Sequence, residues 1–311
     1  MNDIELRHPV NALVSFHYFH KDNIAEIKSW GLNLIGDSGA FSAASQGTPI
    51  DIKQFAEWAS NWKGSFSWIA SLDVIGEAKA SKKNYEWLRS KGLDVVPTIH
   101  YGSNPEMIKD YVSDGVDFIG LGGMVGFKGE PDRLLRWALS MFKYAKDNHP
   151  EVRFHGWGVT HPKIVNSLPW FSVDSSGFSS AYRYARLSLF DPQTSKRVGI
   201  SLDGKDIFNH SRLLRDVYKV DPIKVCISDK NNRRDLVRLS VASAQRLEDF
   251  LRKRHKVSAP VYGLSNNSEG KKVHFVDTYT GHFELMRNNQ IGTRIHVANS
   301  SIKDHEVLKG N

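Results

Sequence analysis

Three aspartates of this chain each end a short run of apolar residues. They are Asp37, Asp73 and Asp174. A carboxylate beside a buried run loses hydrating water, which costs free energy unless the group caps a helix, forms a turn or serves a function. If the three carboxylates meet in one cavity, they raise one another's pKa, so that one stays ionised as a nucleophile while another carries a proton.

Glycines, aromatic rings and histidines stand at the ends of similar runs. These residues are Phe41, His100, Gly122, Gly123, His155 and Trp157. Glycine lets backbone groups approach a flat ligand, and an aromatic ring can stack on one, although core packing is the alternative for Trp157. Because the chain contains no G-x-x-x-x-G-K-[ST] phosphate loop, this set favours a heterocyclic ligand over a phosphate.

Apolar runs that alternate with amphipathic stretches must position these residues. The runs span 11–16, 32–37, 66–73, 94–100, 117–123, 152–158, 170–174 and 223–228. Helical periodicity spans 21–31, 51–62, 103–115, 131–148 and 233–254. Such alternation predicts an α/β fold, and eight buried strands favour a (β/α)₈ barrel whose site lies at the carboxyl ends of the strands. A doubly wound open sheet is the alternative.

The same pattern predicts how the chain is organised. Residues 1–256 form the barrel, in which 191–222 are an insertion before the last strand. Residues 257–311 form a small, β-rich C-terminal extension.

Composition narrows the class of protein. The chain has 311 residues, a net charge of +8 and one cysteine, Cys226, so it forms no intramolecular disulfide and no cysteine-rich zinc site. It lacks an apolar signal segment at the N-terminus and a membrane span, and we expect a cytoplasmic protein, in bacteria or in the phage-infected host. The positive charge, dense over 230–256, favours a nucleic-acid partner, with a solvated helix face as the alternative.

The first of these motifs resemble those of the tRNA-guanine transglycosylases, the queuine and archaeosine tRNA-ribosyltransferase family. D-S-G-A-F at 37–41 is similar to the family's D-S-G-G-[FY], and S-L-D at 71–73 is similar to the segment that carries its guanine-reading aspartate. G-G-M-V-G at 122–126 is similar to G-G-L-A-V-G, although it is one residue shorter.

Later motifs extend the resemblance to about residues 12–190. H-G-W-G at 155–158 is similar to the family's M-G-V-G. V-D-S-S at 173–176, followed by Y-A-R at 184–186, resembles F-D-S-A-A-Y…Y-A-R of archaeal-type members.

The resemblance implies a guanine-exchange reaction. Asp174 is then the nucleophile at the sugar, Asp37 the general acid and base, and Asp73 the reader of the base edge together with His100. The remaining base contacts come from stacking by Phe41 and His155, from the backbone of Gly122 and Gly123, and from Trp157. Phosphate contacts are expected from Arg183, Arg186, Arg252, Lys253 and Arg254. No cofactor or metal is expected, because the family's C-x-C-x-x-C…H zinc motif is absent.

Short members without zinc include enzymes that exchange guanine in DNA for a 7-deazaguanine such as preQ₀, in bacterial modification islands and phages. We therefore expect DNA as the polymer, with tRNA as the alternative, and a free guanine or 7-deazaguanine base as the second substrate. Partner subunits of a modification system fit this setting. Two other readings remain: a glycoside hydrolase, which also uses two carboxylates, and a non-catalytic nucleic-acid-binding barrel.

Overall fold

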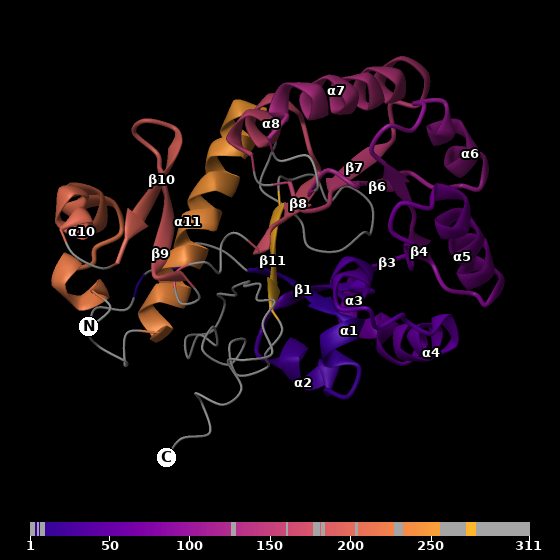
Figure 1. Cartoon of the computed structure of the whole chain (residues 1–311), viewed down its shortest axis with the longest axis horizontal. Helices are drawn as coiled ribbons and strands as arrows, with labels where there is room; N and C mark the ends of the chain where they lie inside the picture. The colour runs from indigo at the N-terminus through magenta and orange to yellow at the C-terminus, as the bar shows by residue number, and fades with distance from the viewer. Residues whose placement is uncertain are drawn as a thin grey trace.

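The computed structural model is a mixed α/β fold built on parallel strands (Figure 1). It describes residues 4, 6, 10–125, 129–159, 161–176, 181, 184–202, 205–226, 233–255 and 272–277. The strands are β1 (Asn11–Ser15), β2 (Asn33–Asp37), β3 (Phe66–Ala70), β4 (Val95–Val96), β5 (Thr98–His100), β6 (Phe118–Gly122), β7 (Arg153–Gly156), β8 (Ser172–Asp174), β9 (Arg186–Asp191), β10 (Lys196–Ser201) and β11 (Lys272–Asp277). The α-helices are α1 (Phe16–Phe19), α2 (Ile24–Ser29), α3 (Ala40–Ser45), α4 (Ile52–Trp62), α5 (Ala78–Ser90), α6 (Met107–Ser113), α7 (Pro131–Asn148), α8 (Pro162–Ser167), α10 (Asp206–Asn209) and α11 (Arg233–Arg254). Shorter turns are the 3₁₀ helices η1 (Lys63–Ser65) and η5 (Pro222–Val225) and the π-helix η4 (Leu213–Val217).

One sheet contains all the strands except β9 and β10. Its order is β4-β3-β2-β1-β11-β8-β7-β6-β5, and each pair in it is parallel. The two ends of this order, β4 and β5, are separated along the chain only by Pro97, which has no amide hydrogen to donate to a ladder. Because the strands are parallel, their carboxyl ends lie at the same edge of the sheet.

Local sequence signals explain where several helices begin. The Asp51 side chain accepts a hydrogen bond from the Lys53 amide and caps α4, and the Asn23 side chain caps α2 through the Glu26 amide. Pro131 occupies the first turn of α7, where its missing amide hydrogen costs nothing. The predicted helices over 51–62, 131–148 and 233–254 are confirmed within one residue.

Alternate residues along the strands belong to two separate apolar clusters. Ala12 and Val14 of β1 pack with the helices, whereas Leu13 between them belongs to a smaller cluster. The smaller cluster consists of Leu13, Ile35, Trp68, Ala70, Val96, Phe118 and Phe171, with Trp157 packed against it. Since successive strand residues point to opposite faces, Asp37 lies on the same face of β2 as Ile35, toward the smaller cluster.

The position of the last strand differs from the prediction. Seven of the eight apolar runs contain strands, but at the eighth, 223–228, the described residues form η5 and a bend. Pro222 starts η5 and the Asp221 side chain caps it by accepting from the Ile223 amide at 3.2 Å, which favours a turn over a strand. The strand between β1 and β8 is β11, which comes from residues predicted to belong to the C-terminal extension.

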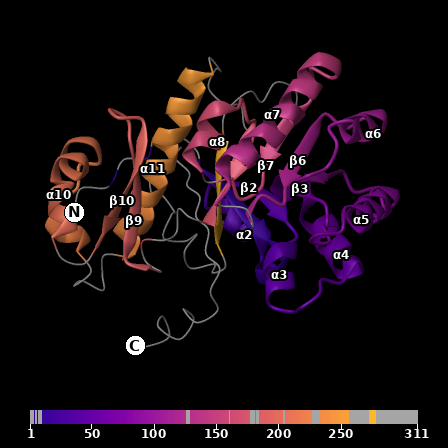
Figure 2. The same cartoon turned by 45° about the horizontal axis from the view of Figure 1, so that its top comes forward.

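The antiparallel hairpin β9–β10 stands beside the parallel sheet, together with α10 (Figures 1 and 2). Helix α11 contacts β9 and β11 and so joins the hairpin to the sheet. The Ser243 hydroxyl on α11 accepts a hydrogen bond from the Phe190 amide of β9 at 2.8 Å. Within the described segments, no helix is both long and apolar enough to cross a membrane.

A buried polar network ties α11 to the amino ends of the strands. The Asn11 amide nitrogen donates to Glu248 at 2.9 Å, Asn33 donates to the Asn11 side-chain oxygen at 2.7 Å, and the Ser67 hydroxyl donates to Asn33 at 2.5 Å. Arg252 donates to the other oxygen of Glu248 at 3.0 Å. Asn11 and Asn33 are the first residues of β1 and β2, so the C-terminal half of α11 lies at the edge of the sheet opposite Asp37 and Asp174.

Candidate active site at the carboxyl ends of the strands

The turn after β2 fixes the orientation of Asp37. Gly39 has a φ of +76°, a left-handed conformation that favours glycine, and its amide donates to Asp37 Oδ2 at 2.9 Å. A Cβ atom at Gly39 would lie 2.1 Å from the Ser15 hydroxyl oxygen, so a side chain does not fit there. The glycine of D-S-G is therefore required by the geometry of the turn that holds the carboxylate.

The electrostatic environment of Asp37 links the three aspartates. Burial raises the pKa of Asp37 to about 7, the negative charge of Asp174 adds to the rise, and Asp73 contributes a smaller increase. The Gly39 and Ser38 amides oppose it by hydrogen bonding to the charged form. Near neutral pH, Asp37 is therefore present both as an acid and as a base, as a proton-transfer group needs to be.

Asp174 ends β8 and is 8% exposed. Its Oδ1 atom accepts a hydrogen bond from the Gly158 amide at 2.7 Å and lies 3.3 Å from Nε2 of His155. Among the residues described, no lysine or arginine lies within ion-pair distance of Asp37, Asp73 or Asp174. Asp37 and Asp174 are thus held by backbone N–H groups rather than neutralised by lysine or arginine.

His155 lies behind Asp174 rather than on the surface of the cavity. Its side chain is fully buried, its Nδ1 is 2.7 Å from the Ser172 hydroxyl, and its ring packs edge to face against Trp68 and Trp157 at centroid distances of 5.0 and 4.2 Å. The predicted stacking of His155 on a base finds no open ring face here, because indole rings and strand residues already cover the ring.

Asp73 and His100 face each other across neighbouring strand ends. Asp73 lies three residues beyond β3, and its Oδ2 is 3.7 Å from Nε2 of His100, the last residue of β5. That distance is too long for a hydrogen bond. Within the described part of the chain, neither ring nitrogen of His100 has a hydrogen-bond partner, although both are buried. Buried polar atoms are normally paired, so this pair is suited to the edge of a ligand.

The aromatic residues and glycines divide between exposed and packed positions. Phe41, in the first turn of α3, is 55% exposed and available for stacking. Trp157 is half-buried, and its indole nitrogen donates to the Thr98 hydroxyl at 3.1 Å. A Cβ atom at Gly122 would lie 2.8 Å from a methyl carbon of Thr98, so packing explains this glycine. Backbone contacts of Gly122 and Gly123 with a base stay a prediction.

The predicted phosphate contacts on α11 lie away from the acids. Arg252 is 7% exposed and donates to both Glu248 and Asp249, at 3.0 and 2.9 Å. The predicted phosphate contact of Arg252 has no exposed guanidinium to make it here, because that group is buried in ion pairs. Lys253 and Arg254 are exposed, but they lie at the amino ends of the strands, where Arg254 donates to the Asn166 carbonyl oxygen at 2.8 Å.

The two remaining arginines are close to β8 in the sequence. Arg186 is exposed at the start of β9, so a phosphate contact there stays a prediction. Arg183 lies outside the described residues.

Three groups near the acids were not among the predicted site residues: the Ser172 hydroxyl, the Gly158 amide and the Ser15 hydroxyl. Ser172 precedes Asp174 by two residues on the same strand, so the two-residue period of a strand could have indicated it. The contacts of the Gly158 amide with Asp174 and of Ser15 with the Gly39 turn join distant segments, and no local pattern marks them.

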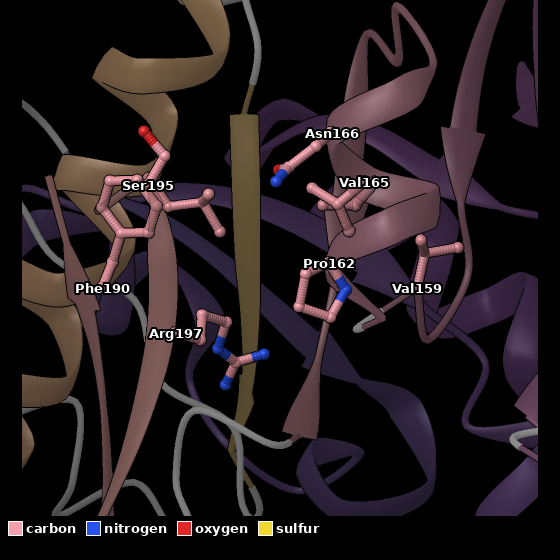
Figure 3. Close-up of a pocket in the computed structure, with 9 residues that line it drawn as sticks. Val159, Pro162, Val165, Asn166, Phe190, Ser195 and Arg197 are labelled. Carbon is pink, nitrogen blue, oxygen red and sulfur yellow. The ribbon is translucent and has the colours of Figure 1, made fainter. Parts of the chain in front are cut away.

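A small hollow lies elsewhere, between the hairpin and α8 (Figure 3). It is lined by Val159, Pro162, Val165, Asn166, Val173, Phe190, Ser195, Arg197 and Leu247. Figure 3 shows the Arg197 side chain extending from the hairpin side toward this space. Burial lowers the pKa of Arg197 to about 10, which leaves it charged at neutral pH. None of the predicted site residues lines this hollow.

Asp37, Asp73 and Asp174 are called the acid cluster below. Within the described residues, no group of three His, Cys, Asp or Glu side chains could hold a metal ion. Comparison of the chain with protein-family models, with curated proteins and with solved structures finds no match.

Proposed function

We propose that the parallel strands close into a (β/α)₈ barrel with the acid cluster at its mouth. The strand order supports closure, because it begins at β4 and ends at β5, which flank Pro97 in a single segment. The smaller apolar cluster also supports it, since its members come from β1, β2, β3, β4 and β6 and from the segments beside β7 and β8. Such a cluster is what the packed interior of a barrel requires.

We further propose that this site exchanges a guanine in a polynucleotide for a free 7-deazaguanine base. The observation that carries the proposal is the electrostatic link between two carboxyl groups at the strand ends. Burial, together with the charge of Asp174, raises the pKa of Asp37 to about 7, and Asp174 Oδ1 accepts a hydrogen bond from the Gly158 amide. Two carboxyl groups in different environments at one site are typical of glycosyl transfer.

The proposed reaction has two steps. An oxygen of Asp174 attacks the anomeric carbon while the bond from that carbon to the base nitrogen breaks, and guanine leaves with the proton of Asp37. Asp37, now a carboxylate, then takes the proton from the ring nitrogen of the incoming base. That nitrogen attacks the anomeric carbon and releases Asp174 as a carboxylate. After the two steps Asp37 has regained its proton, and no net charge or proton has been gained or lost.

Base recognition follows from the groups beside the two acids. Asp73 accepts hydrogen bonds from the N–H groups of the guanine edge, and His100 adds a further edge contact from its unpaired ring nitrogens. Phe41 stacks on one face of the base. A base in a duplex must first leave the stack to reach such a site.

DNA is the polymer that we favour, with tRNA as the alternative. The net charge of +8 supports a polyanionic partner in either case. Helix α11 is not part of the proposed DNA-binding surface. Arg252 is ion-paired, and Lys253 and Arg254 lie at the edge of the sheet opposite the acids.

The test is base incorporation by the purified protein. Labelled guanine and labelled preQ₀ are each incubated with duplex DNA, single-stranded DNA and tRNA, and label bound to the polymer is counted. We expect incorporation into DNA. Label in tRNA alone would change the polymer but keep the reaction, whereas release of guanine without incorporation would indicate a hydrolase. No incorporation and no release with any polymer would overturn the proposal.

A further inference from the structure

The contacts of Asp174 distinguish its two carboxylate oxygens. Oδ1 accepts from the Gly158 amide at 2.7 Å and lies 3.3 Å from His155 Nε2. No hydrogen bond of the described residues reaches Oδ2. A carboxylate held through one oxygen keeps the other available for attack, with its orientation fixed by the groups behind it.

The surroundings of His155 decide which ring nitrogen carries its proton. Burial lowers the pKa of His155, so the ring is neutral near pH 7 and has one N–H. If Nδ1 carried that proton, the lone pair of Nε2 would face the Asp174 carboxylate at 3.3 Å, which is repulsive. If Nε2 carries it, the N–H points toward Asp174 and the Ser172 hydroxyl donates to Nδ1 across 2.7 Å. Only the second arrangement directs a donor toward Asp174 while keeping the contact between Nδ1 and Ser172.

We propose that His155 is a positioning residue for the nucleophile: its Nε2–H, together with the Gly158 amide, holds Oδ1 of Asp174, so that Oδ2 is the oxygen that attacks the sugar. This inference rests on the proposed function and deepens it. Ser172 acts one step further away, because its hydroxyl fixes the tautomer of His155.

The packing around His155 supports this role. Trp68 and Trp157 enclose the ring and hold it in one orientation, and they carry no charge that would attract a proton to it. Asp174 is the one titratable side chain of the described residues that has an ion-pair contact with His155. The distance of 3.3 Å is long for a hydrogen bond, and such contacts often shorten when substrate binds.

The first part of the test observes the tautomer directly and needs no substrate. Nitrogen NMR of protein labelled at its 13 histidines, with the His155 signal assigned from the His155→Gln variant, is recorded from pH 5 to 8. We expect a neutral ring protonated at Nε2 near pH 7 and above, and a changed His155 signal in Asp174→Asn and in Ser172→Ala. A ring protonated at Nδ1, or at both nitrogens near pH 7, would overturn the inference.

The second part measures exchange by His155→Gln and His155→Phe. The Gln side chain can place an amide N–H near the position of Nε2, whereas Phe keeps an aromatic ring and loses both nitrogens. We expect Phe to lower kcat by roughly tenfold to a hundredfold, the range lost when a partner that orients a reacting group is removed, with KM for the base unchanged and partial recovery in Gln.

Unfolding curves of both variants separate loss of fold from loss of positioning. A rise in KM for the base with kcat unchanged would return His155 to a base-contacting role and refute the inference. If the wild-type protein incorporates no base, the proposed function fails, while the NMR measurement still decides the arrangement of His155 and Asp174.

Discussion

The two edges of the parallel sheet both bury polar side chains, but they differ in whether the buried carboxylates have positively charged partners. At the amino ends of the strands, the carboxylate of Glu248 accepts from Asn11 and Arg252, and Arg252 also reaches Asp249. At the carboxyl ends, Asp37 and Asp174 have no lysine or arginine partner among the described residues. One edge is neutralised and the other holds an excess of negative charge.

We interpret the amino edge as contributing to stability, and the carboxyl edge is the one to which we assign the proposed reaction. Burial, together with the charges of Asp174 and Asp73, raises the pKa of Asp37 and so disfavours its charged form in the folded chain. Groups with such shifted pKa values cluster at functional sites. A satisfied network such as that of Glu248 leaves no group available for a ligand. Substitutions at the two edges should therefore affect different quantities, namely the rate of exchange and the stability of the fold.

The largest effect is expected from Asp174→Asn. The amide is nearly isosteric but far less nucleophilic than a carboxylate, so base exchange should be abolished while the unfolding curve changes little. Incorporation of labelled base, measured beside thermal unfolding, checks both quantities. Full exchange by this variant would refute Asp174 as the nucleophile.

Asp37→Asn should slow exchange by about 10²–10⁴-fold, because proton transfer typically contributes that much. The wild-type rate of guanine departure should also fall as the pH rises through about 7, where Asp37 loses its proton, and this dependence should be absent in the variant. Rates of single-turnover exchange between pH 5 and 9 measure both effects. An unchanged dependence on pH in the variant would assign the proton to another group.

The same substitution should stabilise the fold at neutral pH. The pKa of Asp37 rises from 3.8 to about 7 on folding, so between these values the folded chain keeps a proton that the unfolded chain has lost. Stability therefore falls as the pH rises through this window and stays lower above it. Asp37→Asn removes that loss, and its gain above pH 7 should be on the order of a few kcal/mol. Urea unfolding at pH 4 and pH 8 should show the gain only at the higher pH.

Glu248→Gln should lower the stability of the fold and leave the rate of exchange unchanged, which is the opposite of what we expect from the acids at the other edge. Breaking a buried ion pair leaves Arg252 without its main partner and costs about 3–5 kcal/mol of stability. Exchange per folded molecule should stay unchanged, since Glu248 lies far from the acids. Asp249→Asn is the matched control with a smaller cost, because its side chain is 28% exposed. A loss of stability in Glu248→Gln no larger than in this control would contradict the comparison.

The smallest effect is expected from changing Lys253 and Arg254 together to alanine. Both lie at the amino ends of the strands, so DNA affinity and its dependence on salt should stay as in the wild type. Binding curves at several salt concentrations would detect the loss of even one or two phosphate contacts. A flatter salt dependence would show that the polymer extends to this edge.

The sequence by itself determined the α/β class, seven of the strand positions and the residues Asp37 and Asp174 at strand ends. These follow from local rules: apolar runs of strand length, the period of amphipathic helices, and a D-S-G turn that only glycine can complete. Such signals are contained within a few neighbouring residues, so they can be read without the partner segments.

Tertiary structure alone decided the last strand, the burial of His155 and the ion pairs of Arg252. The space between β1 and β8 is filled by β11 rather than by 223–228, a choice between distant segments that local propensity does not encode. His155 became a buried partner of Asp174 because Trp68 and Trp157 cover its ring. Arg252 became an ion-paired residue because its face of α11 turns toward the sheet. Burial depends on which segments meet, and that is a property of the whole fold.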